Sequence, residues 1–250
     1  KRLFQQDTRI KRIEKGSRIA VTGGSRGIQA IDKITLAVVR ELKELGAEPF
    51  IVPAMGSHGG ATAEGQRKVL AEYGISEESM GVPVRSSMEV EEIGKLATGL
   101  PVFLDREALK SDGIVIVNRI KPHTGFTADY ESGLIKMLAI GLGKHKGATT
   151  YHTCGIDMFG ELLPQIGKVV LAKAPILFGL AIIENGYDHP ARFEIVWGED
   201  LIEREKALLT EAKSLMPKII PDNLHLLIVH EIGKEISGCG MDPNITGRSS

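Results

Sequence analysis

The chain has 250 residues, of which 42% are hydrophobic and 25% are charged, so it has enough apolar material for a large buried core. Its 31 basic and 32 acidic residues give a formal net charge of -1. This balance provides no overall positive field, so nucleic acid and anionic membrane surfaces are not expected as partners.

No part of the sequence indicates a membrane protein or a secreted one. No apolar run reaches the roughly 18 residues that a bilayer span requires, and the segment KRLFQQDTRIKR lacks the apolar stretch of a signal peptide. We therefore expect a cytoplasmic protein. In that compartment the two cysteines, Cys154 and Cys239, which have no CxxC spacing, are expected to be free thiols.

The first predicted unit is a strand, a glycine turn and a helix. Residues 17–22 form a short apolar run, and residues 28–45 carry helical apolar spacing that ends before a glycine. The intervening TGGSRGI looks like the nucleotide loop of short-chain dehydrogenases, in which glycines let a pyrophosphate approach the start of a helix. Gly23, Gly24 and Ser25 are therefore candidates for cofactor binding, and a plain glycine turn is the equally simple alternative.

Two features argue against a dehydrogenase. Gln29 stands where the last glycine of that fingerprint belongs, and none of the four tyrosines has a lysine four residues later, as the catalytic pair of that family requires. An NAD(P)-dependent oxidoreductase is therefore the second choice of function. A non-catalytic module that binds a nucleotide or a metallocofactor is a third.

A second predicted strand, residues 48–54, is followed by a glycine-rich loop that contains His58. Thr62 then begins a helix that is expected to end near Tyr73. A loop histidine is usually just a solvated residue, but glycines on both sides of this one leave room for a small ligand to approach the backbone. His58 is thus a candidate functional residue.

The central predicted strand ends in a group of polar side chains. Residues 113–117 are continuously apolar, which indicates a fully buried strand, and Asn118, Arg119, Lys121 and His123 follow it. In open α/β sheets, ligands bind at the carboxyl ends of the strands. We therefore expect a binding site at this end of the sheet.

Lys136 is the one charged residue in the apolar stretch 133–142. A cation buried among apolar side chains is costly unless it is paired or used in covalent chemistry. The alternative is that the lysine merely reaches solvent from the edge of a helix, which is the commoner fate of a lone lysine. On this segment alone the two interpretations are evenly balanced.

The remaining predicted elements complete an α/β fold with a mostly parallel sheet and flanking helices. Residues 175–183 indicate another buried strand, and residues 193–197 a shorter one. The other elements are short strands or a hairpin within 83–104, a short helix at 105–109, a helix over 147–171 interrupted near Gly155 and Pro164, and an amphipathic helix at 201–215.

Two prolines, Pro217 and Pro221, indicate a linker. Residues 1–216 are expected to form an amino-terminal domain that carries the catalytic and cofactor sites. Residues 222–250 are expected to begin a second α/β domain with a strand at 225–231. Because the chain ends in a Gly/Ser/Thr-rich stretch, we expect that the sequence is incomplete.

Four of the seven histidines, His58, His123, His145 and His152, fall in or beside loops that follow predicted strands. Imidazole titrates near ~6.5, so two histidines on opposite sides of a substrate can exchange a proton at neutral pH, one as base and one as acid. That arrangement suits racemisation. A metal site of His145 and His152 is the competing interpretation, but their spacing is a weak signal without an HExxH motif or a cysteine cluster. Each histidine alone is better explained as structural, so only their joint placement argues for function.

Four motifs occur in the order that they have in the nickel-dependent lactate racemase family. They are GSHGG around His58, KPHTGF around His123, GLIK ending at Lys136, and a histidine at His152. The sequence resembles that family over most of residues 15–250, and the interval from Lys136 to His152 is the most specific part of the resemblance.

This resemblance implies a nickel-dependent isomerase, a racemase or epimerase of a 2-hydroxy acid such as lactate. In the family, a lysine carries a covalently attached nickel-pincer cofactor, nickel with pyridinium-3,5-bisthiocarboxylic acid mononucleotide, which accepts and returns the Cα hydride. The resemblance implies that His58 and His123 are the acid/base pair, that Lys136 carries the cofactor and that His152 completes the nickel coordination. Arg26 resembles the family's active-site arginine, which suits a substrate carboxylate.

The resemblance also implies cofactor-synthesis proteins as partners, and protein produced without them is expected to be an apo form. The sequence departs from the family at Gly23, where the racemase has an aspartate, and in a longer segment between His123 and Lys136. We expect the candidate side chains to meet in one cleft, with His58 facing His123. Desolvation there is expected to lower the pKa of Lys136.

Overall fold

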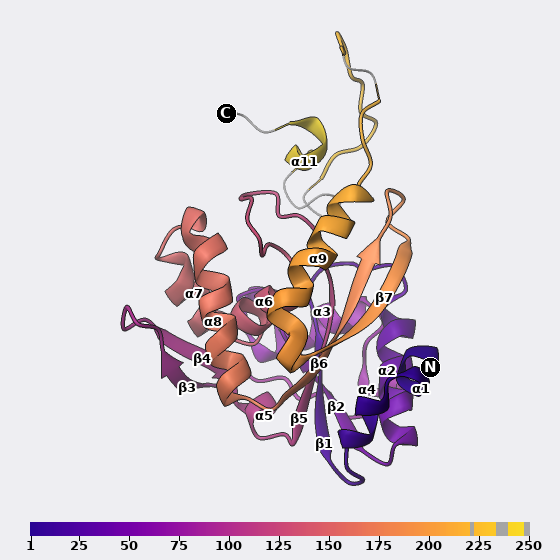
Figure 1. Ribbon diagram of the computed structural model, residues 1–250, viewed down its shortest axis with the longest axis vertical. Coiled ribbons are helices and arrows are strands. Elements are labelled where there is room, and N and C mark those ends of the chain that lie inside the picture. Colours follow the sequence, from indigo (N-terminus) through magenta and orange to yellow (C-terminus); the bar gives the residue numbers. More distant parts are fainter. Residues whose placement is uncertain (221–222, 234–239, 248–250) are drawn as a thin grey trace.

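The computed structural model describes residues 1–220, 223–233 and 240–247, and its centre is a five-stranded sheet (Figure 1). The strands are β1 (Arg18–Gly23), β2 (Glu48–Pro53), β5 (Gly113–Arg119), β6 (Ile176–Glu184) and β7 (Pro190–Trp197). Their order across the sheet is β2-β1-β5-β6-β7, and only the β6–β7 pair is antiparallel. This arrangement confirms the predicted α/β fold with a mostly parallel sheet.

Successive side chains of the central strands join two different buried clusters. In β5, Ile114 and Ile116 join one cluster while Val115 and Val117 join the other. Because neighbouring residues of a strand point to opposite faces, a strand that is apolar at every position has to be covered on both sides. The unbroken apolar run of β5 therefore explains the helices on both faces of the sheet.

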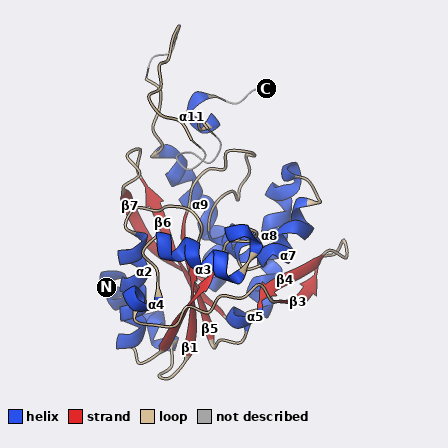
Figure 2. Cartoon of the chain, turned by 180° about the vertical axis from the view of Figure 1, so that it is seen from behind, coloured by secondary structure: helices blue, strands red, loops and turns tan. Residues whose placement is uncertain are grey.

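Helices from the first third of the chain cover one face, and Figure 2 shows the same arrangement from behind. Phe4, Val38 and Met80 are among the buried side chains that pack there with Trp197 of β7. The helices are α1 (Arg2–Gln6), α2 (Ile31–Glu44), α3 (Ala63–Glu72) and α4 (Glu77–Met80), with 3-10 turns at Thr8–Arg12 and Gly59–Ala61.

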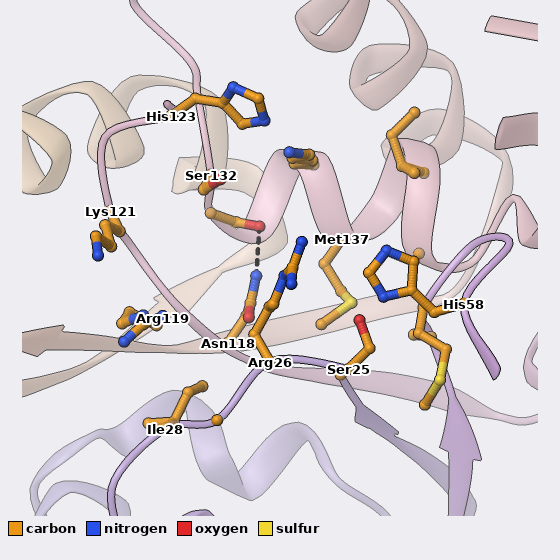
Figure 3. Close-up of a pocket in the computed structure, with 18 of the residues that line it drawn as sticks. Ser25, Arg26, Ile28, His58, Asn118, Arg119, Lys121, His123, Ser132 and Met137 are labelled. Carbon is orange, nitrogen blue, oxygen red and sulfur yellow. Dashed lines mark hydrogen bonds between the residues drawn. The ribbon is translucent and has the colours of Figure 1, made fainter. Parts of the chain in front are cut away.

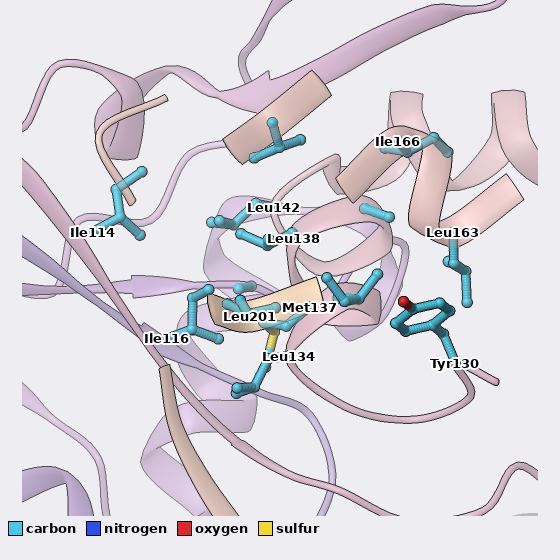
Figure 4. Packing of buried hydrophobic residues seen from close by; sticks show 14 of the residues in the cluster. Ile114, Ile116, Tyr130, Leu134, Met137, Leu138, Leu142, Leu163, Ile166 and Leu201 are labelled. Carbon is cyan, nitrogen blue, oxygen red and sulfur yellow. The ribbon is translucent and has the colours of Figure 1, made fainter. Parts of the chain in front are cut away.

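The other face is covered by later helices and by a separate hairpin. Leu134, Leu138, Leu142 and Ile166 are part of the buried cluster there, as Figure 4 shows. The elements are the antiparallel pair β3 (Val90–Lys95) and β4 (Pro101–Asp105), the helices α5 (Arg106–Leu109), α6 (Leu134–Lys136), α7 (Lys144–His152), α8 (Phe159–Lys173) and α9 (Leu201–Ser214), a π-helical turn at Met137–Gly141, and 3-10 turns at Ile156–Met158 and Gly198–Asp200.

Two predicted helices have different bounds in the structure. The helix after β1 begins at Ile31, three residues later than expected, because residues 24–30 form an extended loop. The helix expected over 147–171 is interrupted near Gly155 as predicted, at a positive φ of 88°, and its two parts span Lys144–His152 and Phe159–Lys173. Pro164 does not interrupt α8, whose buried side continues through Leu163 and Ile166.

The prediction of a strand at residues 225–231 is wrong, because the described residues 223–233 form no strand. A strand needs a neighbour to satisfy its backbone groups, and in this segment Leu226 and Ile228 are 74% and 76% exposed. A short helix, α11 (Pro243–Thr246), follows. Pro221 and Cys239 lie outside the described residues, and Cys154 is an exposed free thiol. In the described part of the chain, no helix is long and apolar enough to cross a membrane.

Candidate active site

A cleft of about 750 Å³ opens at the carboxyl ends of β1, β2, β5 and β6 (Figure 3). The strand β1 lies between β2 and β5, so the chain leaves β1 toward one side of the sheet and later places β5 on the other. Loops that follow β1 and β5 thus turn away from each other, which leaves the crevice where open α/β sheets bind ligands. The site predicted after Val117 is at this position.

Seven of the eight predicted site residues line this cleft. They are Gly24, Ser25, Arg26, His58, His123, Lys136 and His152. They come from five separate places in the chain, and Figure 3 shows His58 and His123 on opposite sides with the Arg26 side chain between them.

Gly23 does not line the cleft, which corrects its assignment to cofactor binding. It is the buried last residue of β1, and a Cβ atom placed on it would lie 2.7 Å from the Leu70 side chain. The aspartate that the family's racemase has at this position would therefore require Leu70 to move. In this chain an apolar contact between β1 and α3 occupies that space.

Lys136 is largely withdrawn from water within the cleft wall. Burial, and secondly the nearby positive charge of Arg26, lower the pKa of its amine to about 8, against a smaller opposite effect of Glu131. Among the described residues, no side chain forms a hydrogen bond or an ion pair with this amine. The neutral, nucleophilic form is therefore accessible near neutral pH.

Two side chains hold the short helix α6 that ends at Lys136. The amide of Asn118, at the end of β5, donates to the carbonyl oxygen of Gly133 at 2.8 Å. The carboxylate of Glu205, in α9, accepts from the backbone N–H of Ile135 at 2.9 Å. Burial raises the pKa of Glu205 to about 7, although N–H donors of Ile135 and Leu134 oppose this rise. Gly133 has no room for a side chain because the Glu205 carboxylate occupies it.

His123 is fixed by its own loop. Its backbone N–H donates to Glu131 at 2.5 Å, and its ring stacks on Phe126 with 4.4 Å between centroids. The N–H of Gly125 donates to Nδ1 at 2.9 Å, so a neutral His123 in this conformation carries its proton on Nε2. Asn244, in α11, donates to the carbonyl oxygen of His123 at 3.2 Å and brings the last described segment to the cleft.

His152 has the opposite tautomer. Its Nδ1 lies 2.5 Å from the carbonyl oxygen of Ala148, and a carbonyl can only accept, so Nδ1 carries the proton. The Nε2 lone pair is then available to a metal, which is the usual state of a histidine ligand. His145 does not line the cleft, and its ring contacts Thr149 at 3.4 Å instead. A site shared by His145 and His152 is thus not supported.

The sequence interpretation missed one wall of the cleft. Glu184, Tyr187 and His189 line the cleft from the end of β6 and the turn that leads to β7, and none of them is among the residues predicted for the site. Glu184 pairs with Arg119 and accepts from the N–H of Gln29 at 3.0 Å. The signal was present, because the turn sequence NGYDH follows the carboxyl end of a buried strand.

The cleft has two cations that are available to an anion. Arg119 is paired with Glu184, and Lys121 lies 3.6 Å from a carboxylate oxygen of Asp242. Arg26 and Lys136, by contrast, have no ion-pair partner within the described ranges. A small anionic group is therefore favoured beside Arg26, whose guanidinium can bind a carboxylate in a bidentate manner.

Comparison with known proteins shows the family of this chain. A family model described as the lactate racemase N-terminal domain matches residues 7–159, which include every cleft residue predicted above. The chain belongs to the lactate racemase N-terminal domain family. A search among curated proteins gave no match.

A solved structure of the lactate racemase apoprotein from Thermoanaerobacterium thermosaccharolyticum is similar to this chain, with a TM-score of 0.63 and 16% identity. The similarity covers 84% of this chain and 54% of that one. At this identity the likeness supports the fold alone. The chain spans about half the length of that racemase.

Proposed function

We propose that this chain is part of a racemase or epimerase of a 2-hydroxy acid and carries a nickel-pincer pyridinium nucleotide on Lys136. The observation that supports this most strongly is a single cleft that contains an unpaired lysine with a pKa of about 8, two histidines of fixed tautomer and an unpaired arginine. Membership of the lactate racemase N-terminal domain family also supports a racemase.

The side chains present fit such a cofactor. Lys136 provides an amine whose neutral form is accessible for covalent attachment. His152 lines the cleft, and because its Nδ1–H is held by Ala148 its Nε2 lone pair is available to a metal. Among the described residues no group of three or more His, Cys, Asp or Glu side chains forms a metal site. In the proposed holoenzyme His152 would be a protein ligand of nickel, and the pincer would supply further ligands.

Arg26 would hold the substrate carboxylate at the base of the cleft. His58 and His123, from two different walls, would then move the proton of the substrate hydroxyl, one on each side. When bound, the pyridinium nucleotide supplies a reversible acceptor for the Cα hydride. Phe159 and Met137 line the same cleft and would exclude water from it.

No observation favours the oxidoreductase alternative. The N–H of Gln29, in the glycine loop, already donates to the Glu184 carboxylate, whose negative charge opposes a pyrophosphate. The helix that should receive a pyrophosphate begins only at Ile31, with Ala30 in the left-handed conformation at a φ of 57°. The glycine loop is better suited to one wall of the racemase cleft.

We also propose that residues from 222 onward belong to a second domain that closes the cleft, and that cofactor-synthesis proteins are required partners. The exposed apolar side chains of the described segment 223–233, including Leu226 and Ile228, support the first proposal, since such a surface is normally covered.

The test is racemisation of a panel of enantiopure 2-hydroxy acids by protein co-expressed with the cofactor-synthesis proteins. His58→Asn and His123→Asn should each slow the conversion of either enantiomer into the other by about 10²- to 10⁴-fold, because each conversion needs one acid and one base. His145→Asn, outside the cleft, is the matched control and should keep its rate. Turnover that depends on added NAD(P), or that survives both substitutions, would contradict the proposal.

A further inference from the structure

Among the described residues, the largest charged side chain that is fully buried is that of Lys144, which has no role in the site described so far. Lys144 is fully buried, and its Nζ lies 2.9 Å from the Asp105 carboxylate, which is fully buried as well. The same ammonium donates to the carbonyl oxygen of Pro53 at 2.5 Å and to Oε1 of Gln66 at 3.3 Å. The ammonium is thus paired with an opposite charge and donates two hydrogen bonds, and a buried charge needs such compensation.

Gln66 contacts both the buried lysine and the loop that carries His58. Its Oε1 accepts from Lys144, so its Nε2 faces the other way and donates to the carbonyl oxygens of Gly56 at 2.9 Å and His58 at 3.2 Å. Only this orientation of the amide matches donors with acceptors, because a lysine cannot accept and a carbonyl cannot donate. The buried lysine thereby fixes the orientation of the amide that holds the loop.

Lys144 lies in the chain between the segments that carry Lys136 and His152, the two other residues of the cleft that matter here. Lys144 follows the π-helical turn after Lys136 and begins α7, the helix that ends at His152. It adopts a left-handed φ of 55°, which a residue with a side chain rarely takes. Such a conformation persists where the surroundings fix it, and here the contacts of the ammonium do so. One side chain thus connects the segments that carry His58, Lys136 and His152.

The contacts of Gln66 do more than compensate the buried lysine. Asp105 and Pro53, at 2.9 and 2.5 Å, lie closer to the Lys144 ammonium than Gln66 does at 3.3 Å. The two donors of Gln66 satisfy carbonyl groups on either side of Ser57 in a loop whose next side chain, His58, reaches the cleft.

We propose that Gln66, oriented by the buried Lys144–Asp105 pair, is a positioning residue that sets the place of the His58 imidazole. This inference rests on the proposed function in that it takes His58 as one of the two proton-transfer groups. It assigns Gln66 no contact with the substrate.

The test uses Gln66→Glu and Gln66→Leu, with Lys68→Gln on the exposed side of the same helix as the matched control. The glutamate variant keeps an acceptor for Lys144 but places an oxygen against the Gly56 and His58 carbonyl oxygens, so it should release the loop without exposing the buried lysine. The leucine variant removes the same donors without adding charge. If one of them fails to fold, the other still decides the question.

Two readouts separate positioning from stability. The first is the NMR signal of the His58 ring, assigned with His58→Gln, which should shift and broaden in both Gln66 variants but not in Lys68→Gln. The second is turnover of the cofactor-loaded enzyme, in which kcat should fall about 10- to 100-fold with little change in KM, as for a group misplaced by about 1 Å. Cofactor attachment at Lys136, measured by intact mass, should be unchanged.

A His58 signal that is identical in wild type and in a folded Gln66 variant would overturn the inference, whatever the activity. A kcat within twofold of wild type in both variants would overturn it as well. If the wild-type enzyme racemises no 2-hydroxy acid, the proposed function fails, but the NMR comparison still decides whether Gln66 positions His58.

Discussion

The carboxylate of Glu205 accepts a hydrogen bond of 2.9 Å from the backbone N–H of Ile135, the residue directly before Lys136. Glu205 is 1% exposed, so a group that is usually ionised at neutral pH lies in the core beneath the helix that carries the candidate cofactor lysine. Burial raises its pKa to about 7. The position of Lys136 is thus linked to a carboxyl group that titrates near neutrality.

This relationship predicts a specific pH dependence of stability. The pKa of Glu205 is about 7 in the folded protein against 4.5 for the ordinary group, so between these values the folded state binds more protons than the unfolded state. The contribution of Glu205 to the free energy of unfolding is therefore complete below about pH 4.5 and declines as the pH rises to 7. Over this window the loss is on the order of 3 kcal/mol at about 1.4 kcal/mol per pH unit.

The measurement is urea unfolding of wild type and Glu205→Gln between pH 5 and 8. The glutamine cannot ionise, so the difference in free energy of unfolding between the two proteins should shift in favour of the variant as the pH rises. Glu203→Gln, at an exposed position of the same helix, is the control. A difference that stays constant with pH would show that Glu205 is not the titrating group.

The second prediction concerns the reactivity of Lys136. Because its pKa is lowered to about 8, its neutral fraction should rise about ten-fold between pH 6 and 7 and approach a plateau above pH 9. Labelling of the apo protein with a small amine-reactive reagent, followed by peptide mapping, should show a pH midpoint near 8 at Lys136. Arg26→Gln removes a positive charge that lowers this pKa, so it should move the midpoint upward. A midpoint near 10 in wild type would contradict the buried environment of this amine.

The third prediction tests the second domain. If residues from 222 onward help to close the cleft, residues 1–216 alone should fold but should turn over 2-hydroxy acids far more slowly than a longer product of the gene, since the reaction would be open to water. Thermal unfolding checks the fold of each protein, and intact mass checks that the cofactor is loaded. Equal turnover by the two proteins would show that the first 216 residues contain the whole site.

Much of the fold could be predicted from the sequence because its strands are locally consistent. The apolar run of β5 indicates a strand covered on both sides, and the polar residues after it indicate the edge where ligands bind. Thr62 caps α3 as expected, accepting from the N–H of Gly65 at 3.0 Å. These features depend on neighbours in sequence, which a pattern records directly.

The features that were missed depend on pairs distant in sequence. Lys144 looked like one of several basic residues in GKHKG, and Glu205 like one acidic residue on an amphipathic helix. Their burial follows from partners about 40 and 70 residues away, Asp105 and Ile135. The predicted strand at 225–231 failed for the same reason, because its pattern is apolar but no described strand lies beside it.

The most direct test of the central claim is the intact mass of the protein after co-expression with cofactor-synthesis proteins. The account predicts a gain in mass that matches one nickel-pincer nucleotide, located at Lys136 by peptide mapping. In Lys136→Arg, which keeps the charge but lacks the nucleophilic amine, that gain should be absent while the protein remains folded. Lys121→Arg, at another lysine of the cleft, should still acquire it. The same gain in mass in Lys136→Arg, or its location at a different residue, would contradict the account.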